Sequence, residues 1–579
     1  MEFKYDPAKG GFQFNAAGKS GQKPPREKKA RKAIASKGGR IAVNLIVTLV
    51  VGFLYYYASL PALNLQAEEF YGFIFLICLV YCVCAMLTAG FRGEGAKGYF
   101  EFVRKQCRIP LILAAAIMVV GLIGAASSWV VLRANAYQKL LPLSAGDFAA
   151  EVDEISYDQI PMLDRDSAQR LGDRKLGELA DMVSQFEVAE DYTQINYQGH
   201  PVRVTPLRYG DAIKWLNNRA DGLPAYLVID MVTQNVEVVR LDEGMKYTTA
   251  EHFSRNLQRH LRFRYPTMMF DTPVFEIDES GTPYWVCARR VKTIGLFGGL
   301  DNRGAVLVNA LTGACEYCEE VPAWVDHVFS ANLIIQQYDY YGLYRNGFWN
   351  SIFGQRDVTQ TTQGYNYLAI GDDVWIYTGV TSVGGDESNI GFLLSNQRTK
   401  ETRYYAVAGA EEFSAMGSAE GQVQQMRYTA TFPLLLNIAD QPTYFMALKD
   451  ASQLVKMYAM VNVSQYQIVA TGSTVMECET NYRAMLSQNG LIGEERSEVG
   501  PVRETIEKRG VIDEIRSAVI GGNTYYYLKF RGESDFSVRV SAADAAYAPM
   551  LSEGEPVIVS YYDGYVSQYW IEAYDVRPD

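Results

Sequence analysis

The sequence predicts three N-terminal transmembrane α-helices, then an α+β extracytoplasmic region of repeated antiparallel β-meander plus helix units, and finally a small OB-like β-barrel. Three observations predict this order: three long apolar runs without a charge, a hairpin pattern that recurs along the middle of the chain, and five short β-type runs near its end. The expected segments are a basic disordered cytoplasmic tail (1–40), the spans (41–132), a mixed helical juxtamembrane region (133–220), the repeated αβ region (221–495) and the barrel (508–579).

The three apolar runs have the length that a membrane-spanning helix requires. They are Ile41–Leu60, Phe70–Gly90 and Pro110–Leu132, each of 20–23 residues without a charge. About 20 helical residues cross a hydrocarbon core of about 30 Å. We therefore expect three helices in the lipid bilayer. Because ion and proton pathways usually carry charged groups inside the spans, this composition disfavours a pump or a coupled transporter.

The flanks of these runs predict their orientation. The tail 1–40 holds eleven Lys and Arg residues, the loop 61–69 holds none, and the loop 91–109 holds five. Positively charged flanks stay in the cytoplasm. We expect a multi-pass plasma-membrane protein with a cytoplasmic N-terminus, in which everything after Leu132 is extracytoplasmic.

Small residues are concentrated in the third run, including Gly121 and Gly124. Such residues let helices approach closely. We expect this span to pack within a bundle or to support a homo-oligomer.

Charge is distributed unevenly along the 579 residues. Residues 1–132 contain 16 Lys and Arg against 7 Asp and Glu, whereas 133–579 contain 38 against 59. Phosphate backbones are bound by clustered Lys and Arg, so we expect no nucleic-acid binding by the acidic region. At its start, Asp164, Asp166 and Ser167 can supply the N-cap of a helix over Ser167–Val183.

A hairpin pattern recurs three times, in Tyr226–Leu241, Val306–Val321 and Phe392–Val407. Each copy is an apolar strand, then Asp or Asn, two residues, Thr, and a second strand. Short polar side chains at such turns bond the local backbone. A looser fourth copy begins in Tyr444–Val461.

Helix-like segments follow two of these copies, at Ala323–Tyr338 and Glu411–Tyr428. A small meander cannot bury its apolar face alone, so we expect each helix to pack across the sheet of its own unit. The residues expected to be buried there are Trp285, Leu307, Trp375 and Leu393.

The second copy resembles PepSY-type modules, which are secreted or membrane-anchored αβ domains. The matching pattern is YWV (Tyr284–Val286) followed by VLVNALTGACEY (Val306–Tyr317). The resemblance covers 280–325 and, more faintly, 374–407, where an Arg-Thr-Lys sequence replaces the Thr-Gly turn. It implies binding or regulation of other proteins rather than catalysis, and no functional residues carry over.

The last part of the chain contains five β-type runs after the charged stretch Glu494–Gly510. Five short strands in about 70 residues are typical of a small OB-like barrel, a fold that binds oligonucleotides, oligosaccharides or proteins. The runs do not form a basic face, which argues against nucleic acid.

The common catalytic motifs do not occur in the sequence. Gly-x-Ser-x-Gly, His-Glu-x-x-His and Gly-x-x-x-x-Gly-Lys-Ser/Thr are all missing. The glycine-rich Gly295–Gly304 lacks the lysine of a phosphate loop and is interpreted as the connection between two strands. We expect no cofactor, and a non-enzymatic role is favoured. A glycosidase-type carboxylate pair stays open, because carboxylates are abundant.

Cys287, Cys315, Cys318 and His327 are the candidate metal ligands, because a C-x-x-C pair with a further Cys and a His is one pattern of zinc sites. The alternatives are a disulfide such as Cys287–Cys315, a redox pair, and buried thiols.

Two further segments are candidate binding surfaces. In His252–Arg264, a helix would place Arg255, Arg259 and Arg262 on one face, where they could hold an anionic polymer or lipid headgroups; the alternative is a solvated face with ion pairs. The aromatic segment Tyr338–Phe353 is a partner surface if exposed and core if buried. Its candidate residues are Tyr338, Tyr340, Tyr341, Tyr344 and Trp349.

These features predict a membrane-anchored extracytoplasmic binding, scaffolding or regulatory protein of a cell-envelope assembly, with a membrane or envelope protein as its partner. The alternatives are an envelope hydrolase that uses carboxylates on a cell-wall polymer, and a subunit of an export or channel complex.

Overall fold

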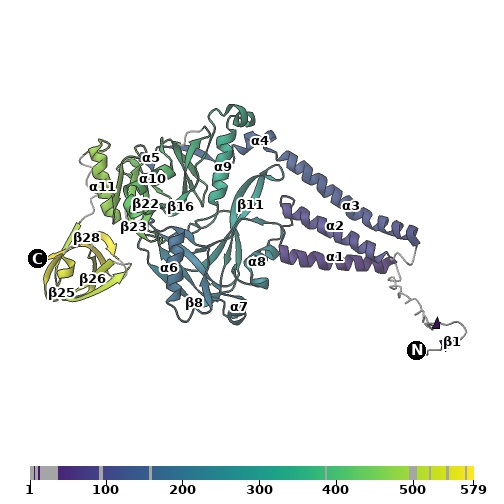
Figure 1. Cartoon of the computed structure of the whole chain (residues 1–579), viewed down its shortest axis with the longest axis horizontal. Coiled ribbons are helices and arrows are strands. Elements are labelled where there is room, and N and C mark those ends of the chain that lie inside the picture. Colours follow the sequence, from purple (N-terminus) through teal and green to yellow (C-terminus); the bar gives the residue numbers. More distant parts are fainter. Residues whose placement is uncertain are drawn as a thin grey trace. The chain divides into compact units, whose positions relative to one another are not determined.

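The computed structural model divides the chain into two compact units (Figure 1). The first contains Met1–Arg133, Tyr247–Asp271 and Arg289–Asp301, and the second contains Ala134–Lys246, Thr272–Ala288 and Asn302–Asp579. The structure describes residues 5–6, 11–12, 37–89, 95–154, 160–384, 388–493, 505–520, 523–542, 545, 547–566 and 570–578. Of the predicted tail 1–40, the described residues are the two-residue strands β1 (Tyr5–Asp6) and β2 (Gly11–Phe12) and residues 37–40, which begin the first long helix.

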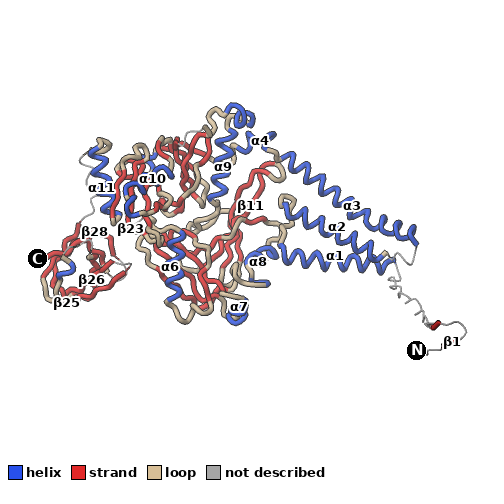
Figure 2. Tube along the Cα trace, in the orientation of Figure 1, coloured by secondary structure: helices blue, strands red, loops and turns tan. Residues whose placement is uncertain are grey.

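The first unit is built on three long apolar helices, drawn in blue in Figure 2. They are α1 (Lys37–Ser59), α2 (Glu68–Thr88) and α3 (Gly95–Ser127). All three are long and apolar enough to cross a membrane. The structure thus confirms that the N-terminal region contains three candidate membrane-spanning helices.

The third helix differs from its predicted bounds. It begins at Gly95, fifteen residues before Pro110, because the intervening Lys, Arg, Glu and Gln residues are good helix formers. Membrane helices tolerate a proline such as Pro110 in their interior. The helix ends at Ser127, where the hydroxyls of Ser127 and Ser128 each donate to the carbonyl of Gly124 at 2.8 Å. The uncharged run therefore marked the apolar part of the helix but not its ends.

Two antiparallel sheets follow in chain order. The β4–β8 sheet has the order β4-β6-β7-β8, with β5 beside β6. Its strands are β4 (Phe186–Val188), β5 (Thr193–Tyr197), β6 (His200–Tyr209), β7 (Leu223–Asp230) and β8 (Val236–Met245). The β9–β13 sheet has the order β10-β11-β12-β13, with β9 beside β11. Its strands are β9 (Met269–Phe270), β10 (Val274–Ile277), β11 (Pro283–Ile294), β12 (Gly298–Asn309) and β13 (Cys315–Cys318).

Two more sheets complete the middle of the chain. The β14–β19 sheet has the order β14-β16-β17-β18-β3, with β15 beside β16 and β19 beside β17. Its strands are β14 (Thr359–Thr361), β15 (Asn366–Ile370), β16 (Asp373–Ser382), β17 (Ser388–Asn396), β18 (Thr402–Tyr405), β19 (Gly409–Ala410) and the parallel β3 (Leu143–Gly146). The β20–β24 sheet has the order β20-β22-β23-β24, with β21 beside β22. Its strands are β20 (Thr429–Ala430), β21 (Leu434–Ile438), β22 (Gln441–Lys449), β23 (Val455–Asn462) and β24 (Val469–Gly472).

The three Asp/Asn-x-x-Thr elements form the same hydrogen-bonded turn. In each, the Oδ1 atom of the first residue accepts the backbone N–H groups two and three positions later. The sets are Asp230 with Val232 and Thr233 (2.8 and 2.7 Å), Asn309 with Leu311 and Thr312 (3.0 and 2.9 Å), and Asn396 with Arg398 and Thr399 (2.8 and 2.9 Å). The residue after each Thr has a positive φ: Gln234 (61°), Gly313 (73°) and Lys400 (66°).

Short helices accompany the sheets. In the second unit they are α4 (Val130–Tyr137, begun in the first unit), α5 (Phe148–Glu151), α6 (Arg165–Gly177), α7 (Ala212–Asn218), α9 (Ala331–Tyr344), η3 (Asn350–Gly354), α10 (Glu412–Gln422), η4 (Gln424–Met426) and α11 (Val475–Gln488). In the first unit they are η2 (Phe253–Arg255) and α8 (Leu257–Arg264).

The helices do not cover the sheets that were predicted for them. Ile334 and Tyr338 of α9 pack with Leu393 of the following β14–β19 sheet rather than with the preceding sheet, and α10 contacts β20, β22, β23 and β24. The expectation that each helix packs on its own unit is therefore wrong. In the β9–β13 sheet, Val325 and Val328 of the loop before α9 cover the apolar face, so the helix is free to cover the next one.

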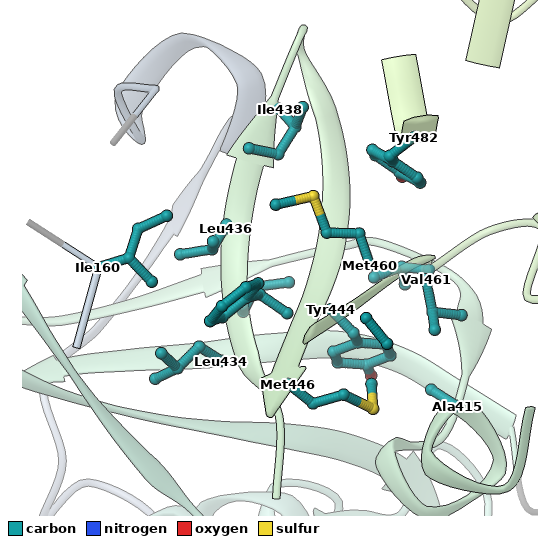
Figure 3. Close-up of a cluster of buried hydrophobic side chains, with 14 of the residues drawn as sticks. Ile160, Ala415, Leu434, Leu436, Ile438, Tyr444, Met446, Met460, Val461 and Tyr482 are labelled. Atoms are coloured by element: carbon teal, nitrogen blue, oxygen red, sulfur yellow. The ribbon is translucent and has the colours of Figure 1, made fainter. Parts of the chain in front are cut away.

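The four residues predicted to be buried in the repeats are all buried. The exposed fractions of Trp285, Leu307, Trp375 and Leu393 are 0%, 6%, 8% and 1%. Figure 3 shows part of the largest core, to which the β14–β19 and β20–β24 sheets both contribute. Tyr444 and Met446 of β22 and Ala415 of α10 lie in this core (Figure 3). The β14–β19 and β20–β24 sheets therefore share one core rather than standing as isolated meanders.

The C-terminal strands close into a barrel. The closed order is β25-β26-β27-β29-β28, with β27 and β29 parallel. The strands are β25 (Thr505–Ile520), β26 (Asn523–Phe530), β27 (Glu533–Ser541), β28 (Pro556–Val566) and β29 (Ile571–Pro578), and η6 (Ala548–Met550) lies between β27 and β28. Val538, Val540, Val557 and Val559 belong to its own apolar core. The prediction of a five-stranded barrel at the end of the chain is therefore confirmed.

Candidate functional site

Two arginines close the end of α1 within the first unit. The Nε of Arg259 donates to the carbonyl of Tyr57 at 3.2 Å, and its guanidinium lies 4.2 Å from the centroid of the Tyr57 ring. The Nε of Arg262 donates to the carbonyl of Leu60 at 2.9 Å. The last carbonyls of a helix lack intrahelical partners, and the helix dipole there favours cations. Arg259 and Arg262 thus satisfy the end of α1.

The loop between α1 and α2 also bonds segments from later in the chain within the first unit. The amide of Asn64 donates to the carbonyl of Thr267 at 3.0 Å. The amide of Gln66 donates to the carbonyl of Lys292, on β11, at 2.9 Å. Side-chain amides that bond backbone carbonyls on other segments hold the loop in one place.

The tip of the β11–β12 hairpin binds the end of α3. The backbone N–H of Phe297 donates to the hydroxyl of Ser128 at 2.8 Å, and the Phe297 ring lies 5.4 Å from that of Tyr71. Gly124 faces this tip, where a Cβ atom would lie 2.7 Å from Leu296. The small residues of α3, predicted to serve helix packing, therefore also admit the hairpin tip.

This arrangement divides the predicted anion-binding stripe. Arg255 lies in η2, whereas Arg259 and Arg262 lie in α8. Burial lowers the pKa of Arg262, and the nearby Tyr56 hydroxyl and Glu69 carboxylate oppose that shift. Arg259 bonds a carbonyl in the last turn of α1 and Arg262 bonds that of Leu60, just after the helix, and binding of an external anion by the three arginines stays a prediction.

The structure does not assemble the predicted metal ligands. None of the eight cysteines, all of which lie among the described residues, is joined in a disulfide, so the alternative bond between Cys287 and Cys315 is not formed in this structure. Cys315 and Cys318 are three positions apart on β13, and side chains at that spacing leave opposite faces of a strand. The Nδ1 of His327 lies 3.0 Å from a carboxylate oxygen of Glu276. In the described part of the chain, no group of three or more His, Cys, Asp or Glu side chains is arranged to hold a metal.

The predicted aromatic surface is mostly packed. Tyr338 is 2% exposed, and Tyr340, Tyr341 and Tyr344 are half-buried. Stacked rings continue from Tyr340 through Tyr344 towards Trp349, which is 64% exposed. Of the five candidate residues, Trp349 alone presents most of its ring to solvent.

A cavity of about 420 Å³ lies in the second unit, where three sheets meet. β6 contributes Arg203, β15 contributes Asn366 and Tyr367, and β22 contributes Phe445 and Met446. The remaining polar lining is contributed by Asp164, Arg165, Tyr192, Tyr365 and Thr431. Cavities of this size, with apolar walls and a few polar groups, are typical of small-molecule sites.

Arg203 is the main charge in the cavity. Its side chain is 7% exposed. Its Nε donates to the carbonyl of Leu163 and its Nη2 to Gln194, both at 3.5 Å, the long limit for a hydrogen bond. Burial lowers the pKa of Arg203 to about 10, opposed by the nearby Tyr367 hydroxyl and Asp164. Among the described residues, no carboxylate forms an ion pair with it.

Asp164 is already matched by partners. One carboxylate oxygen accepts the N–H of Ser167 at 2.9 Å, which confirms Asp164 as the N-cap of α6, and the other pairs with the ammonium of Lys449. Burial alone would raise the pKa of Asp164, but the bonds from Lys449 and Ser167 hold it below its usual value. Asp164 is the one carboxylate among the described residues that line the cavity. A glycosidase needs two, about 5–10 Å apart.

The cavity was missed at the sequence level, because its walls come from segments far apart in the chain. Arg203 did leave a signal, since it is a single charge between Val202 and Val204 in the centre of an apolar strand. Strand alternation alone does not say whether such a charge meets a counterion, and the partners of Arg203 depend on tertiary structure.

Comparison with known proteins adds little to these observations. No family model matches the chain, and no curated protein matches it. Among solved structures, a levansucrase variant from B. megaterium aligns with a TM-score of 0.16 and 8% sequence identity, over 79% of this chain and 95% of that one. A likeness at this score carries no argument about fold or function.

Proposed function

We propose that this chain is a membrane-anchored extracytoplasmic binding protein with a scaffolding or regulatory role in a cell-envelope assembly. The observation that carries the proposal is the cavity, in which a buried guanidinium lacks a carboxylate partner among the described residues and the one carboxylate in the lining is already paired. Such a lining suits binding, and it lacks the second carboxylate that the alternative, a cell-wall hydrolase, would use. The third alternative, a channel or export subunit, has no specific support.

The orientation is part of this proposal. The tail and the 91–109 loop would be cytoplasmic, and the chain after Leu132 extracytoplasmic, because basic flanks stay inside. Single cysteines placed in 61–69 or after Leu132 should react with an impermeant maleimide on intact cells, in a variant whose native thiols are replaced. Cysteines in the tail should react only after lysis, and labelling of the tail on intact cells would reverse the orientation.

Two finer assignments accompany the proposal. We infer that the β4–β8, β9–β13, β14–β19 and β20–β24 sheets are copies of one PepSY-like module, supported by the shared meander order and by the common turn of three of them. We also infer that the barrel is OB-like, supported by its five strands, its closed order and its parallel β27–β29 pair. Both assignments favour contacts with other molecules over catalysis.

The proposed partner is a membrane or envelope protein. Trp349 and Phe353 are 64% and 79% exposed, and exposed aromatic groups of this kind are enriched in protein interfaces. A homo-oligomer through α3 is a further candidate, supported by its small residues.

The full-length protein tests the function most directly. After cross-linking on intact cells and purification in mild detergent, it should retain an envelope component, identified by mass spectrometry, in near-stoichiometric amount. The same preparation should release no soluble fragments from isolated cell wall. Release that disappears in an Asp164→Asn variant would instead establish a hydrolase and contradict the proposal.

A further inference from the structure

We propose that the cavity at Arg203 binds a small organic acid, whose single carboxylate pairs with the Arg203 guanidinium while its apolar body lies against aromatic and methionine side chains. This inference rests on the proposed binding function and names the chemical class of the ligand.

The first step concerns charge. A buried guanidinium that lacks a counterion carries a large desolvation cost. Near Arg203 the other buried cation, Lys449, is already matched by Asp164. The side chain of Arg165 donates to the carbonyl of Glu190 at 2.6 Å and is exposed, so water solvates its charge and it adds no second buried cation to the site. Among the described residues, one buried positive charge therefore remains without a carboxylate, and one negative charge on a ligand balances it.

The second step concerns hydrogen bonds. Both bonds that Arg203 makes are 3.5 Å long, and the Nε2 of its neighbour Gln194 is buried without a partner among the described residues. Donors thus outnumber acceptors around the guanidinium. A carboxylate supplies acceptors only, and it pairs with a guanidinium through two parallel bonds.

The third step concerns the rest of the ligand. Met162, Met231, Phe432, Phe445 and Met446 line the cavity together with Tyr367. A bare inorganic anion would leave these apolar walls uncovered. A volume of about 420 Å³ instead accommodates an anion with a ring or a short acyl chain, and burial of that body adds favourable hydrophobic free energy.

The test is ligand-dependent thermal stabilisation of the full-length protein in detergent. The probes are phenylacetate, phenylpropionate and octanoate, each beside its neutral primary amide. The acids should raise the unfolding temperature in a concentration-dependent manner, because a ligand that binds only the folded state stabilises it, and the amides should not. Arg203→Met should weaken the acids by at least about tenfold, which is 1.4 kcal/mol of binding free energy.

A matched control lies on the same strand. Arg208 is partly exposed and pairs with Glu187 and Glu190 at 3.2 and 3.5 Å, so Arg208→Met should leave acid binding unchanged. Without ligand, Arg203→Met should unfold at the same or a higher temperature than the wild type, because it removes a buried charge that has no carboxylate partner among the described residues. A lower unfolding temperature, or failure to fold, would mean that Arg203 is a structural cation and would overturn the inference.

The remaining outcomes also decide the matter. Equal effects of acids and amides, equal losses in the two methionine variants, or no effect of any acid on the wild type each overturn the organic-acid assignment. The binding function itself is judged by the cross-linking and cell-wall experiments, so its failure is distinguishable from failure of the ligand class.

Discussion

At the scale of single residues, the second unit accommodates buried ionisable groups in three ways. Asp164 is matched by Lys449 and a helix N-terminus. Glu412, at the start of α10, is 0% exposed, and burial raises its pKa to about 7. Arg203 has neither an ion-pair partner among the described residues nor an accessible neutral form, because a guanidinium whose pKa is about 10 stays charged at neutral pH. Asp164 is matched by partners in the chain and Glu412 can be relieved of its charge by taking up a proton, so Arg203 is where a ligand is expected.

Glu412 makes the stability of the chain depend on pH. Its folded-state pKa of about 7 lies above the ordinary 4.5, so between these values the folded chain keeps a proton that the unfolded chain has released. Stability should be highest below about pH 4.5 as far as this group is concerned, fall between about pH 4.5 and 7 by on the order of 3 kcal/mol, and then level off. Glu412→Gln should remove most of this fall, measured by pulse proteolysis in urea at several pH values. Glu243→Gln, on an exposed position of β8, should keep the wild-type profile.

Trp375 and Trp349 form a matched pair of aromatic side chains. Trp375, on β16, is 8% exposed and packs in the largest core, whereas Trp349 is 64% exposed. Trp375→Ala should cost about 3–5 kcal/mol of unfolding free energy, through lost burial and the cavity that it leaves. Trp349→Ala should cost less than about 0.5 kcal/mol. Pulse proteolysis of both full-length variants in urea gives the comparison, and similar losses would contradict the core assignment of Trp375.

The sequence predicted the burial of Trp375, but it did not predict which groups pair with Arg203. Strand alternation and an apolar neighbourhood place a tryptophan inside, whatever the partners are. Whether a charged side chain in a strand is paired depends on segments outside its own hairpin, such as the one that brings the Leu163 carbonyl, 40 residues away in sequence, to Arg203.

At the scale of elements, the sequence predicted the features that depend on neighbouring residues, namely the spans and the turns. The length of an apolar run indicates a span, and an Asp or Asn followed by Thr three residues later indicates a turn. The choice of sheet that α9 and α10 cover was not predictable, because a short helix with an apolar face fits either neighbouring sheet. Likewise, Arg259 and Arg262 show a basic helix face in the sequence, but their carbonyl partners at the end of α1 and just after it lie 202 residues away.

The shared turn predicts that exchanging Gln and Gly at equivalent positions changes the stability of the chain in opposite directions. Gln234 and Gly313 occupy the same place after the Thr, both with positive φ, a region that suits glycine. Gln234→Gly should therefore stabilise the chain by about 0.5–1 kcal/mol, and Gly313→Gln should destabilise it by about 1–2 kcal/mol. Thermal unfolding of the two full-length variants reports the signs. Two shifts of the same sign would argue against equivalent turns.

At the scale of the whole molecule, the first unit combines segments that are far apart in the chain. The three spans, the α8 region and the tip of the β11–β12 hairpin form one unit, although more than a hundred residues separate α3 from α8. Neither run length nor periodicity predicts such an association, which depends on complementary surfaces. The contact between α3 and the hairpin tip nevertheless explains why α3 ends in small residues. A side chain at Gly124 would occupy the space of Leu296 and Phe297 in the tip.

The two glycines of α3 provide the sharpest test of this junction. A Cβ at Gly124 would lie 2.7 Å from Leu296 and 2.8 Å from Phe297, whereas a Cβ at Gly121 would make an ordinary 3.5 Å contact with Tyr71. Overpacking of that severity costs about 1–3 kcal/mol, so Gly124→Ala should displace the hairpin tip and accelerate amide hydrogen exchange in 293–299 by at least about tenfold. Gly121→Ala, one turn earlier on the same helix, should leave exchange there unchanged. Hydrogen exchange and mass spectrometry on the full-length protein in detergent measure both variants. Equal protection of the hairpin tip in the two variants would show that its position does not depend on close packing against Gly124. The hydrogen bond between Phe297 and Ser128 would then have to hold the tip alone.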